Sequence, residues 1–243
     1  MRGGDRMLKR NIIVGILLGS VAPIGFTALQ VSANTVGYQS QATVEFVGST
    51  VVTPPVNPTD PTDPLKPVRP VNPGTQGPLS IDYVSNIQFS QQQISGKDSV
   101  YYAQLDQLVD KNGKVGDYPN FVQVTDNRGS NAGWKMTVAQ AQPFMNGKNQ
   151  LDGTVIALMN GTMSGINAHQ PTPANQAEIK PDGQAVSVMT AKADSGVGTW
   201  SERFGKDNAS AKKSISLFVP AESKKVAGSY KSELTWTLTD TNL

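Results

Sequence analysis

Two segments about a hundred residues apart share one hydrophobic pattern, in which a Trp alternates with large aliphatic residues. Every second position is apolar in residues 133–138 and again in residues 234–239. These apolar residues are Trp134, Met136 and Val138 in the first segment, and Leu234, Trp236 and Leu238 in the second. Because successive side chains of a strand point to opposite faces, each segment predicts a strand with one buried face.

Shorter runs rich in Thr, Val, Ile, Tyr and Phe, separated by Asn-Gly and Asp-Gly turns, predict further strands. Together, the predicted strands lie near residues 80–84, 99–103, 121–125, 133–138, 154–159, 185–190, 198–202, 214–219 and 232–239. Regularly spaced short strands are typical of an all-β fold. We therefore expect an antiparallel β-sandwich or flattened barrel over residues 79–243.

One more strand pattern precedes this domain, in residues 34–50. There Ala42, Val44 and Phe46 alternate with Thr43 and Glu45. An isolated strand is not stable in water, so we expect this N-terminal strand to join the sheet of the main domain.

The two parts are joined by residues 51–78, where proline recurs at every third position. The prolines in this period are Pro55, Pro58, Pro61, Pro64, Pro67, Pro70 and Pro73. A polyproline II helix has three residues per turn, so this spacing favours a stiff, polyproline-II-like spacer. The alternative is that a second ridge of the same helix, with Val56, Leu65 and Val71, docks along the β-domain.

The segment around Trp236 resembles the terminal motif of the WxL-domain family, cell-surface proteins of low-GC Gram-positive bacteria such as lactic-acid bacteria and enterococci. Residues 79–84, 124–129, 133–134, 198–200 and 217–220 fit the same family in its order. The chain departs from it at Met136, where Leu is usual, and at residues 240–243, which lack a common proline.

This resemblance implies a secreted protein that attaches non-covalently to peptidoglycan. It also implies partners, namely membrane-anchored WxL-interacting proteins and other WxL proteins in a surface complex. Two other functions stay open: an adhesin that binds host or plant extracellular matrix and, more remotely, a cell-wall hydrolase.

Residues 1–33 have the features of a secretory signal peptide: a basic start, an apolar stretch over residues 12–29 and a small-residue cleavage site at residues 31–33. An uncleaved membrane anchor is the alternative. Four of the 21 basic residues and one of the 19 acidic residues lie in this segment, which leaves 17 against 18 and a net charge of −1. That balance gives no support for nucleic-acid binding.

The chain contains no Cys and a single His, His169, so thiol catalysis and His-based metal clusters have no residues to form them. Residues 110–117 superficially resemble a calcium loop, but Lys114 stands where an oxygen ligand is needed. We expect no catalytic residues, no cofactor and no metal site.

The remaining candidates concern contact with the wall. Trp134, Met136, Leu234, Trp236 and Leu238 share faces with other apolar residues, which favours the core over stacking on sugars. Trp200 follows a Gly-rich stretch and is a candidate surface aromatic. Lysines gather in the last forty residues and are candidate contacts with an anionic wall, or a solvated face; they include Lys212, Lys213, Lys224 and Lys225.

Overall fold

The computed structural model describes residues 36–241, and the expected signal peptide lies outside this range. The chain divides into two units, Met1–Val44 and Glu45–Leu243. Residues 36–55 carry no strand. The N-terminal strand predicted around Val44 is therefore not formed in this structure, and the side chains of Val44 and Phe46 are 77% and 89% exposed.

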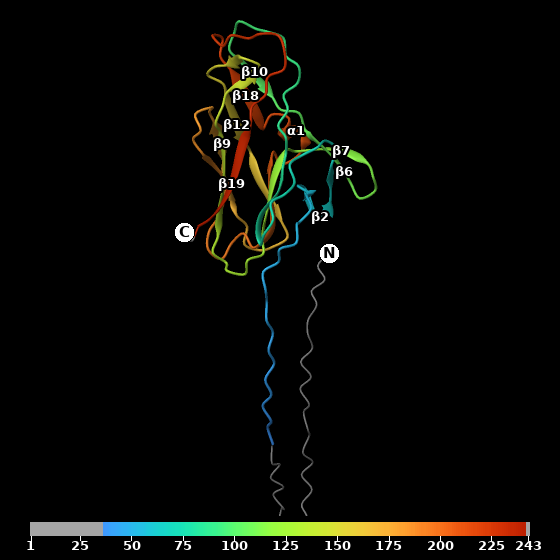
Figure 1. Ribbon diagram of the computed structural model, residues 1–243. Helices are drawn as coiled ribbons and strands as arrows, with labels where there is room; N and C mark the ends of the chain where they lie inside the picture. The colour runs from blue at the N-terminus through green and yellow to red at the C-terminus, as the bar shows by residue number, and fades with distance from the viewer. Residues whose placement is uncertain (1–35, 242–243) are drawn as a thin grey trace, which may run out of the picture. The chain divides into compact units, whose positions relative to one another are not determined.

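Three four-stranded antiparallel sheets make up the β-domain (Figure 1). The first sheet, in spatial order, consists of β14 (Thr172–Pro173), β16 (Val186–Ala191), β9 (Trp134–Gln140) and β19 (Leu234–Asp240). The second consists of β13 (Gly161–Gly165), β17 (Gly198–Phe204), β8 (Phe121–Asp126) and β4 (Leu79–Val84). The third consists of β15 (Gln176–Ile179), β12 (Val155–Met159), β18 (Ile215–Val219) and β5 (Ser99–Tyr102). The predicted all-β, antiparallel fold is thus confirmed.

One hydrophobic core joins the three sheets. It contains Met136 from the first sheet, Val124 from the second and Ile156 from the third, all at most 2% exposed. Strands that cover such a core alternate apolar and polar residues, and β9 does so with the burial pattern that its sequence predicts. In β8, by contrast, all six residues are buried, because other parts of the chain cover both of its faces.

Smaller elements surround these sheets. A three-stranded sheet is formed by β3 (Lys66–Pro67), β6 (Asp106–Val109) and β7 (Val115–Tyr118). Two further antiparallel pairs are β1 (Val56–Asn57) with β2 (Asp60–Pro64), and β10 (Phe144–Asn146) with β11 (Asn149–Leu151). The single short helix within residues 36–241, α1 (Asn208–Ala211), is capped by the carboxylate of Asp207, which accepts a hydrogen bond from the Ser210 amide.

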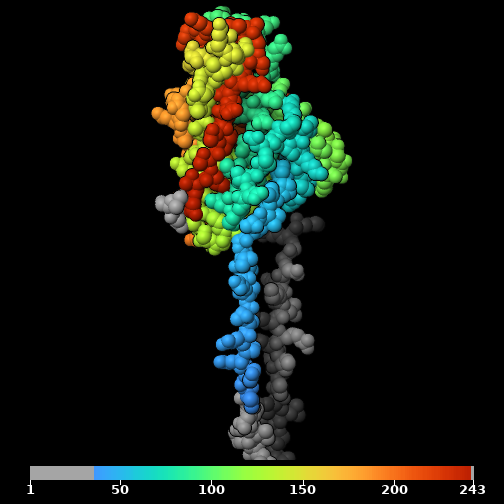
Figure 2. Space-filling view, in the orientation of Figure 1, coloured from blue at the N-terminus to red at the C-terminus, as the bar shows by residue number. Residues whose placement is uncertain are grey.

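The Pro-rich segment is folded against the β-domain, where Figure 2 shows it as the light-blue to cyan chain on the surface of the domain. Leu65 is only 1% exposed and belongs to a second apolar cluster with Tyr83, Leu108 and Phe121. Of the two alternatives for this segment, the structure therefore has the docked one, although only part of the apolar ridge is covered and Val68 stays exposed.

Two polar side chains of the β-domain, buried Gln123 and half-buried Arg203, hold the docked segment in place. The amide of Gln123 accepts a hydrogen bond from the backbone N–H of Val56, at 2.8 Å, and donates one to the carbonyl of Pro54, at 3.0 Å. The guanidinium of Arg203 donates to the carbonyl of Pro58 at 2.9 Å. Prolines lack an N–H but keep their carbonyls, so donors from the β-domain are the natural way to attach such a segment.

Candidate functional site

The two Trp-bearing segments lie side by side as the antiparallel strands β9 and β19. Trp236 stands opposite Val138, Leu238 opposite Met136, and Trp134 opposite Asp240. The two halves of the sequence motif therefore form one structural unit, although roughly a hundred residues separate them.

The indole of Trp134 is an internal part of this unit. Trp134 and Met136 are both 0% exposed. The indole N–H of Trp134 donates to the carbonyl of Gly196 at 3.2 Å, which satisfies its one polar atom inside the core. A Cβ on Gly196 would lie 2.8 Å from the indole nitrogen, so the chain needs glycine there.

On β19, Leu234, Trp236 and Leu238 are half-buried and pack on the same core. Their opposite-facing neighbours, Thr235 and Thr237, are exposed. None of the five motif residues thus presents a fully exposed ring or chain to a ligand, and the motif's visible role is to hold two strands together over the core.

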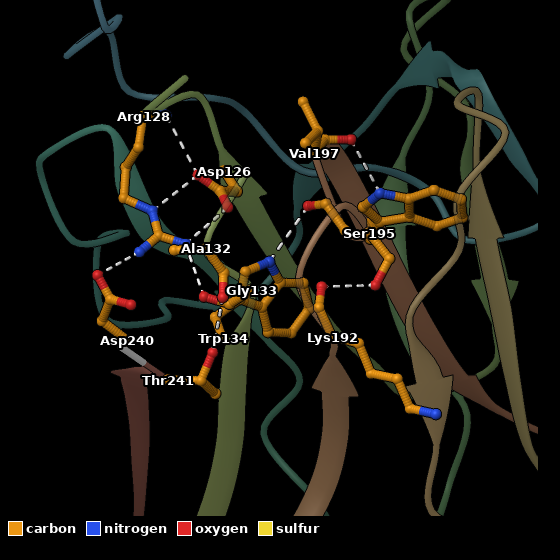
Figure 3. A network of polar contacts seen from close by, with 12 residues as sticks. Asp126, Arg128, Ala132, Gly133, Trp134, Lys192, Ser195, Val197, Asp240 and Thr241 are labelled. Carbon is orange, nitrogen blue, oxygen red and sulfur yellow. Dashed lines mark hydrogen bonds and ion pairs between the residues drawn. The ribbon is translucent and has the colours of Figure 1, made fainter. Parts of the chain in front are cut away.

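Arg128 stabilises the end of this strand pair at which β9 begins and β19 ends (Figure 3). The guanidinium of Arg128 donates to both carboxylate oxygens of Asp126, at 2.9 and 2.8 Å, and to the carbonyl of Gly133 at 2.8 Å. It also pairs with the carboxylate of Asp240 at the end of β19. The bonds to Asp126 are the main reason why the pKa of Arg128 is raised.

We call the three side chains of Asp126, Arg128 and Asp240 the clamp. A neighbouring hydroxyl adds one more bond at this end of the strands. Thr241, directly after β19, donates to the carbonyl of Ala132 at 2.9 Å. The sequence analysis did not find the clamp, because no local pattern connects residue 128 with residue 240. The only available signal was the resemblance carried by residues 124–129.

Trp200, the candidate surface aromatic, is instead buried, with 2% of its surface exposed. Its indole N–H donates to the carbonyl of Val197 at 3.0 Å, and its ring lies against the backbone of Gly165 on the neighbouring strand β13. The glycines before Trp200 pack on other residues, Gly196 on Trp134 and Gly198 on Asn167, and they do not expose the ring. Trp200 is therefore not available for a wall polymer.

The four candidate lysines differ in their surroundings. Lys212, Lys213 and Lys224 are exposed. Lys225 is half-buried, and its ammonium donates to the carbonyls of Pro220, at 2.8 Å, and Ser223, at 3.2 Å. Lys225 therefore closes a local turn, whereas the other three ammonium groups face solvent.

Lys212 borders a groove of about 310 Å³. Its other lining residues are Arg69, Ala103, Gln104, Leu105, Gln107 and Asp117. Two cations, two primary amides and one carboxylate thus surround a small apolar floor. Its lining can therefore offer both positive charge and amide hydrogen bonds to a polar ligand.

Glu202 on β17 is the most unusual ionisable group of the domain. It is 0% exposed, and neither carboxylate oxygen has a hydrogen-bond partner among the described residues. Burial raises the pKa of Glu202 to about 9, so its side chain is a neutral acid at pH 7. A Cβ at Gly161 on β13 would collide with its Oε1, which shows how closely the neighbouring strand packs on it.

Within residues 36–241, no group of three or more His, Asp or Glu side chains is placed to hold a metal ion. The same residues contain no helix that is long and apolar enough to cross a membrane.

The chain thus folds into an all-β domain in which the Trp-bearing motif packs on the core. The groups that could contact a ligand lie on its polar surface. A family model described as the WxL domain, surface cell wall-binding, matches residues 33–241. The chain belongs to this family and is a cell-surface protein with a cell wall-binding domain. No curated protein and no solved structure matches it.

Proposed function

We propose that this protein attaches non-covalently to peptidoglycan, without catalysing a reaction, as one component of a multi-protein complex at the surface of a Gram-positive cell. The observation that carries the proposal is the match of the cell wall-binding family to residues 33–241, which include every strand of the β-domain. Membrane-anchored partners and other proteins of the same family are the companions that this role implies.

The motif residues support wall binding indirectly, by building the domain. Trp134 and Met136 are fully buried, and Trp236 is half-buried against the core. Burying such a ring stabilises a fold by a few kcal/mol. Loss of wall binding after a Trp substitution would therefore report unfolding before it reports a lost contact.

The groove beside Lys212 is the part of the surface whose chemistry suits the wall best. Peptidoglycan carries acetamido groups on its sugars and free carboxylates on its stem peptides. The amides of Gln104 and Gln107 can both donate to and accept from an acetamido group. Arg69 and Lys212 carry the positive charges that a carboxylate requires. Exposed Lys213 adds a third cation next in sequence.

Co-sedimentation with purified peptidoglycan sacculi tests the proposal. The chain from Asn34 onward is mixed with sacculi over a salt series, and circular dichroism on the same samples reports folding. We expect saturable binding by folded protein, weakened by salt because charges at the surface are screened. Folded protein that stays in the supernatant would refute direct binding to peptidoglycan.

Charge reversal then tests the groove. Lys212→Glu and Arg69→Glu together should weaken binding at least ~10-fold, since they replace attraction by repulsion of carboxylates. Lys148→Glu, at another exposed lysine, is the matched control and should bind like the parent. Equal binding by all three proteins would remove the groove from the wall-contact surface.

A further inference from the structure

The segment before the Pro-rich chain exposes several large apolar side chains. Val44, Phe46 and Val47 are 77%, 89% and 83% exposed. Residues 42–47 contain neither Pro nor Gly and combine β-branched and aromatic residues with strict alternation up to Phe46. Such a segment is strongly predisposed to pair with a sheet edge, and it is not stable as a lone strand.

β19 offers a sheet edge that fits this segment. It is the outermost strand of the first sheet and pairs only with β9 among the described strands, so its other edge presents backbone groups over residues 234–239 that no neighbouring strand pairs. Figure 2 shows β19, in red, on the surface of the domain. Its core-facing residues, Leu234, Trp236 and Leu238, are only half-buried, which leaves apolar surface that one more strand would cover.

The two patterns match face by face. On β19 the apolar residues face the core and Thr235, Thr237 and Thr239 face solvent. An added strand with Val44 and Phe46 toward the core would place Thr43 and Glu45 on the threonine side. Exposed Lys135 lies on that side of the neighbouring strand, opposite Thr239, and supplies a charge complementary to Glu45.

The direction of the chain favours a strand that comes from a second molecule. A Cβ on Gly48 would lie 3.3 Å from the carbonyl oxygen of Asn127, so the segment leaves the domain beside the clamp at the Asp240 end of β19. If residues 42–47 folded back on β19 of the same molecule, they would run toward the Asp240 end, as β19 itself does. The two strands would then be parallel. Parallel pairs are slightly less stable than antiparallel ones, and a second molecule has no such constraint.

We propose that residues 42–47 of one molecule add as an antiparallel strand to the free edge of β19 in a second copy of this chain. If the exchange is mutual, each molecule donates one strand and accepts one, and the result is a closed two-fold dimer. The backbone hydrogen bonds of the added strand would provide affinity, and its alternating side chains would fix the register.

Cysteine pairing tests this exchange directly, since the natural chain has no Cys to interfere. Glu45 and Thr237 lie near the centres of the two strands and on the same polar face of the proposed pair. Glu45→Cys and Thr237→Cys are made in separate proteins from Asn34 onward, mixed and oxidised. We expect a disulfide-linked heterodimer, because paired strands bring Cα atoms within the 4.4–6.8 Å that a disulfide spans.

The matched control is Tyr38→Cys mixed with Thr237→Cys. Tyr38 is as exposed as Glu45's neighbours but lies outside the alternating segment. Heterodimer yield no higher than in this control would overturn the proposal. A protein carrying both Glu45→Cys and Thr237→Cys that closes only within itself would overturn it as well, because it would show pairing inside one molecule.

Self-association gives a second, independent readout. We expect the unmodified protein to form dimers in sedimentation velocity, and Val44→Asp with Phe46→Asp to weaken the association at least ~10-fold by placing charges against the core. Both side chains are outside the core, so the variant should fold normally. Tyr38→Asp is the control and should dimerise like the parent. Equal dimerisation of all three proteins, or none in the parent, would refute the exchange.

Discussion

The guanidinium of Arg128 pairs with the carboxylate of Asp240, 112 residues later in the chain. The same guanidinium is fixed by Asp126, whose side chain is 3% exposed. Arg128 therefore connects the end of β8 with the end of β19, which belong to different sheets. This connection determines where the second Trp-bearing strand ends, although neither Trp takes part in it.

Replacing Arg128 with Ala should destabilise the domain by about 3 kcal/mol, because removing one partner of a buried ion pair leaves the Asp126 carboxylate unpaired. Urea unfolding followed by Trp fluorescence measures the change. Asp240→Asn is the informative comparison, since Asp240 is 37% exposed and should matter by less than about 1 kcal/mol. Equal losses in the two variants would contradict the central role of the Asp126 pair.

Glu202 predicts how stability depends on pH. Its pKa rises from 4.5 to about 9 on folding, so above pH 4.5 the unfolded chain holds fewer protons than the folded one. The free energy of unfolding should therefore fall as pH rises from about 4.5 to about 9, by up to about 1.4 kcal/mol per pH unit. Glu202→Gln cannot ionise and should remove this slope.

Thermal unfolding of parent and Glu202→Gln at several pH values measures the difference. Glu178→Gln, at an exposed carboxylate on β15, should keep the slope of the parent. If Glu202→Gln retained that slope too, Glu202 would not be the group that carries it.

Gly165 should not tolerate a side chain. A Cβ there would clash with the Trp200 ring, and overpacking of this kind typically costs about 1–3 kcal/mol. Chemical denaturation of Gly165→Ala checks this. Gly96→Ala is the control, because nothing lies within 4 Å of a Cβ at that position. A Gly165→Ala protein as stable as the control would show that the ring has room to move.

The docked Pro-rich segment should contribute to the stability of the whole domain. Leu65→Ala removes a fully buried side chain and should cost about 2–5 kcal/mol. Val68→Ala, three residues later and 43% exposed, should cost much less. Unfolding midpoints in urea compare the two. Similar midpoints would indicate that the segment separates from the domain before the domain unfolds.

Much of the fold could be predicted from alternation. Each of the nine predicted strands has an observed counterpart, from β4 to β19, because these strands have one apolar face over a common core. β13 (Gly161–Gly165) was missed, because it contains two glycines and only one large apolar residue. It forms a strand because its backbone pairs with β17. Period-two patterns detect a strand with a continuous apolar face, whereas β13 contributes mainly backbone pairing with β17 and the single apolar side chain of Met163.

The remaining differences come from contacts between distant residues. Trp200 is buried because Gly165 leaves space for its ring, and no pattern around residue 200 contains that information. Leu65 is buried because Leu108 and Phe121 form an apolar surface beneath it, which a period of three in the prolines does not indicate. The alternation at residues 42–46 predicted a strand that this structure does not form, because no sheet edge pairs with the segment.

The adjacency of β9 and β19 also restricts when the domain can acquire its structure. β9 has one face over the core and an edge that stays open until residues 234–240 are present. A ribosome, or any apparatus that passes the chain from its N-terminus, delivers these residues roughly a hundred positions after Trp134. Contacts so distant in sequence form slowly. The first sheet therefore cannot be completed before residues 234–240 are present, so the domain acquires its final packing late.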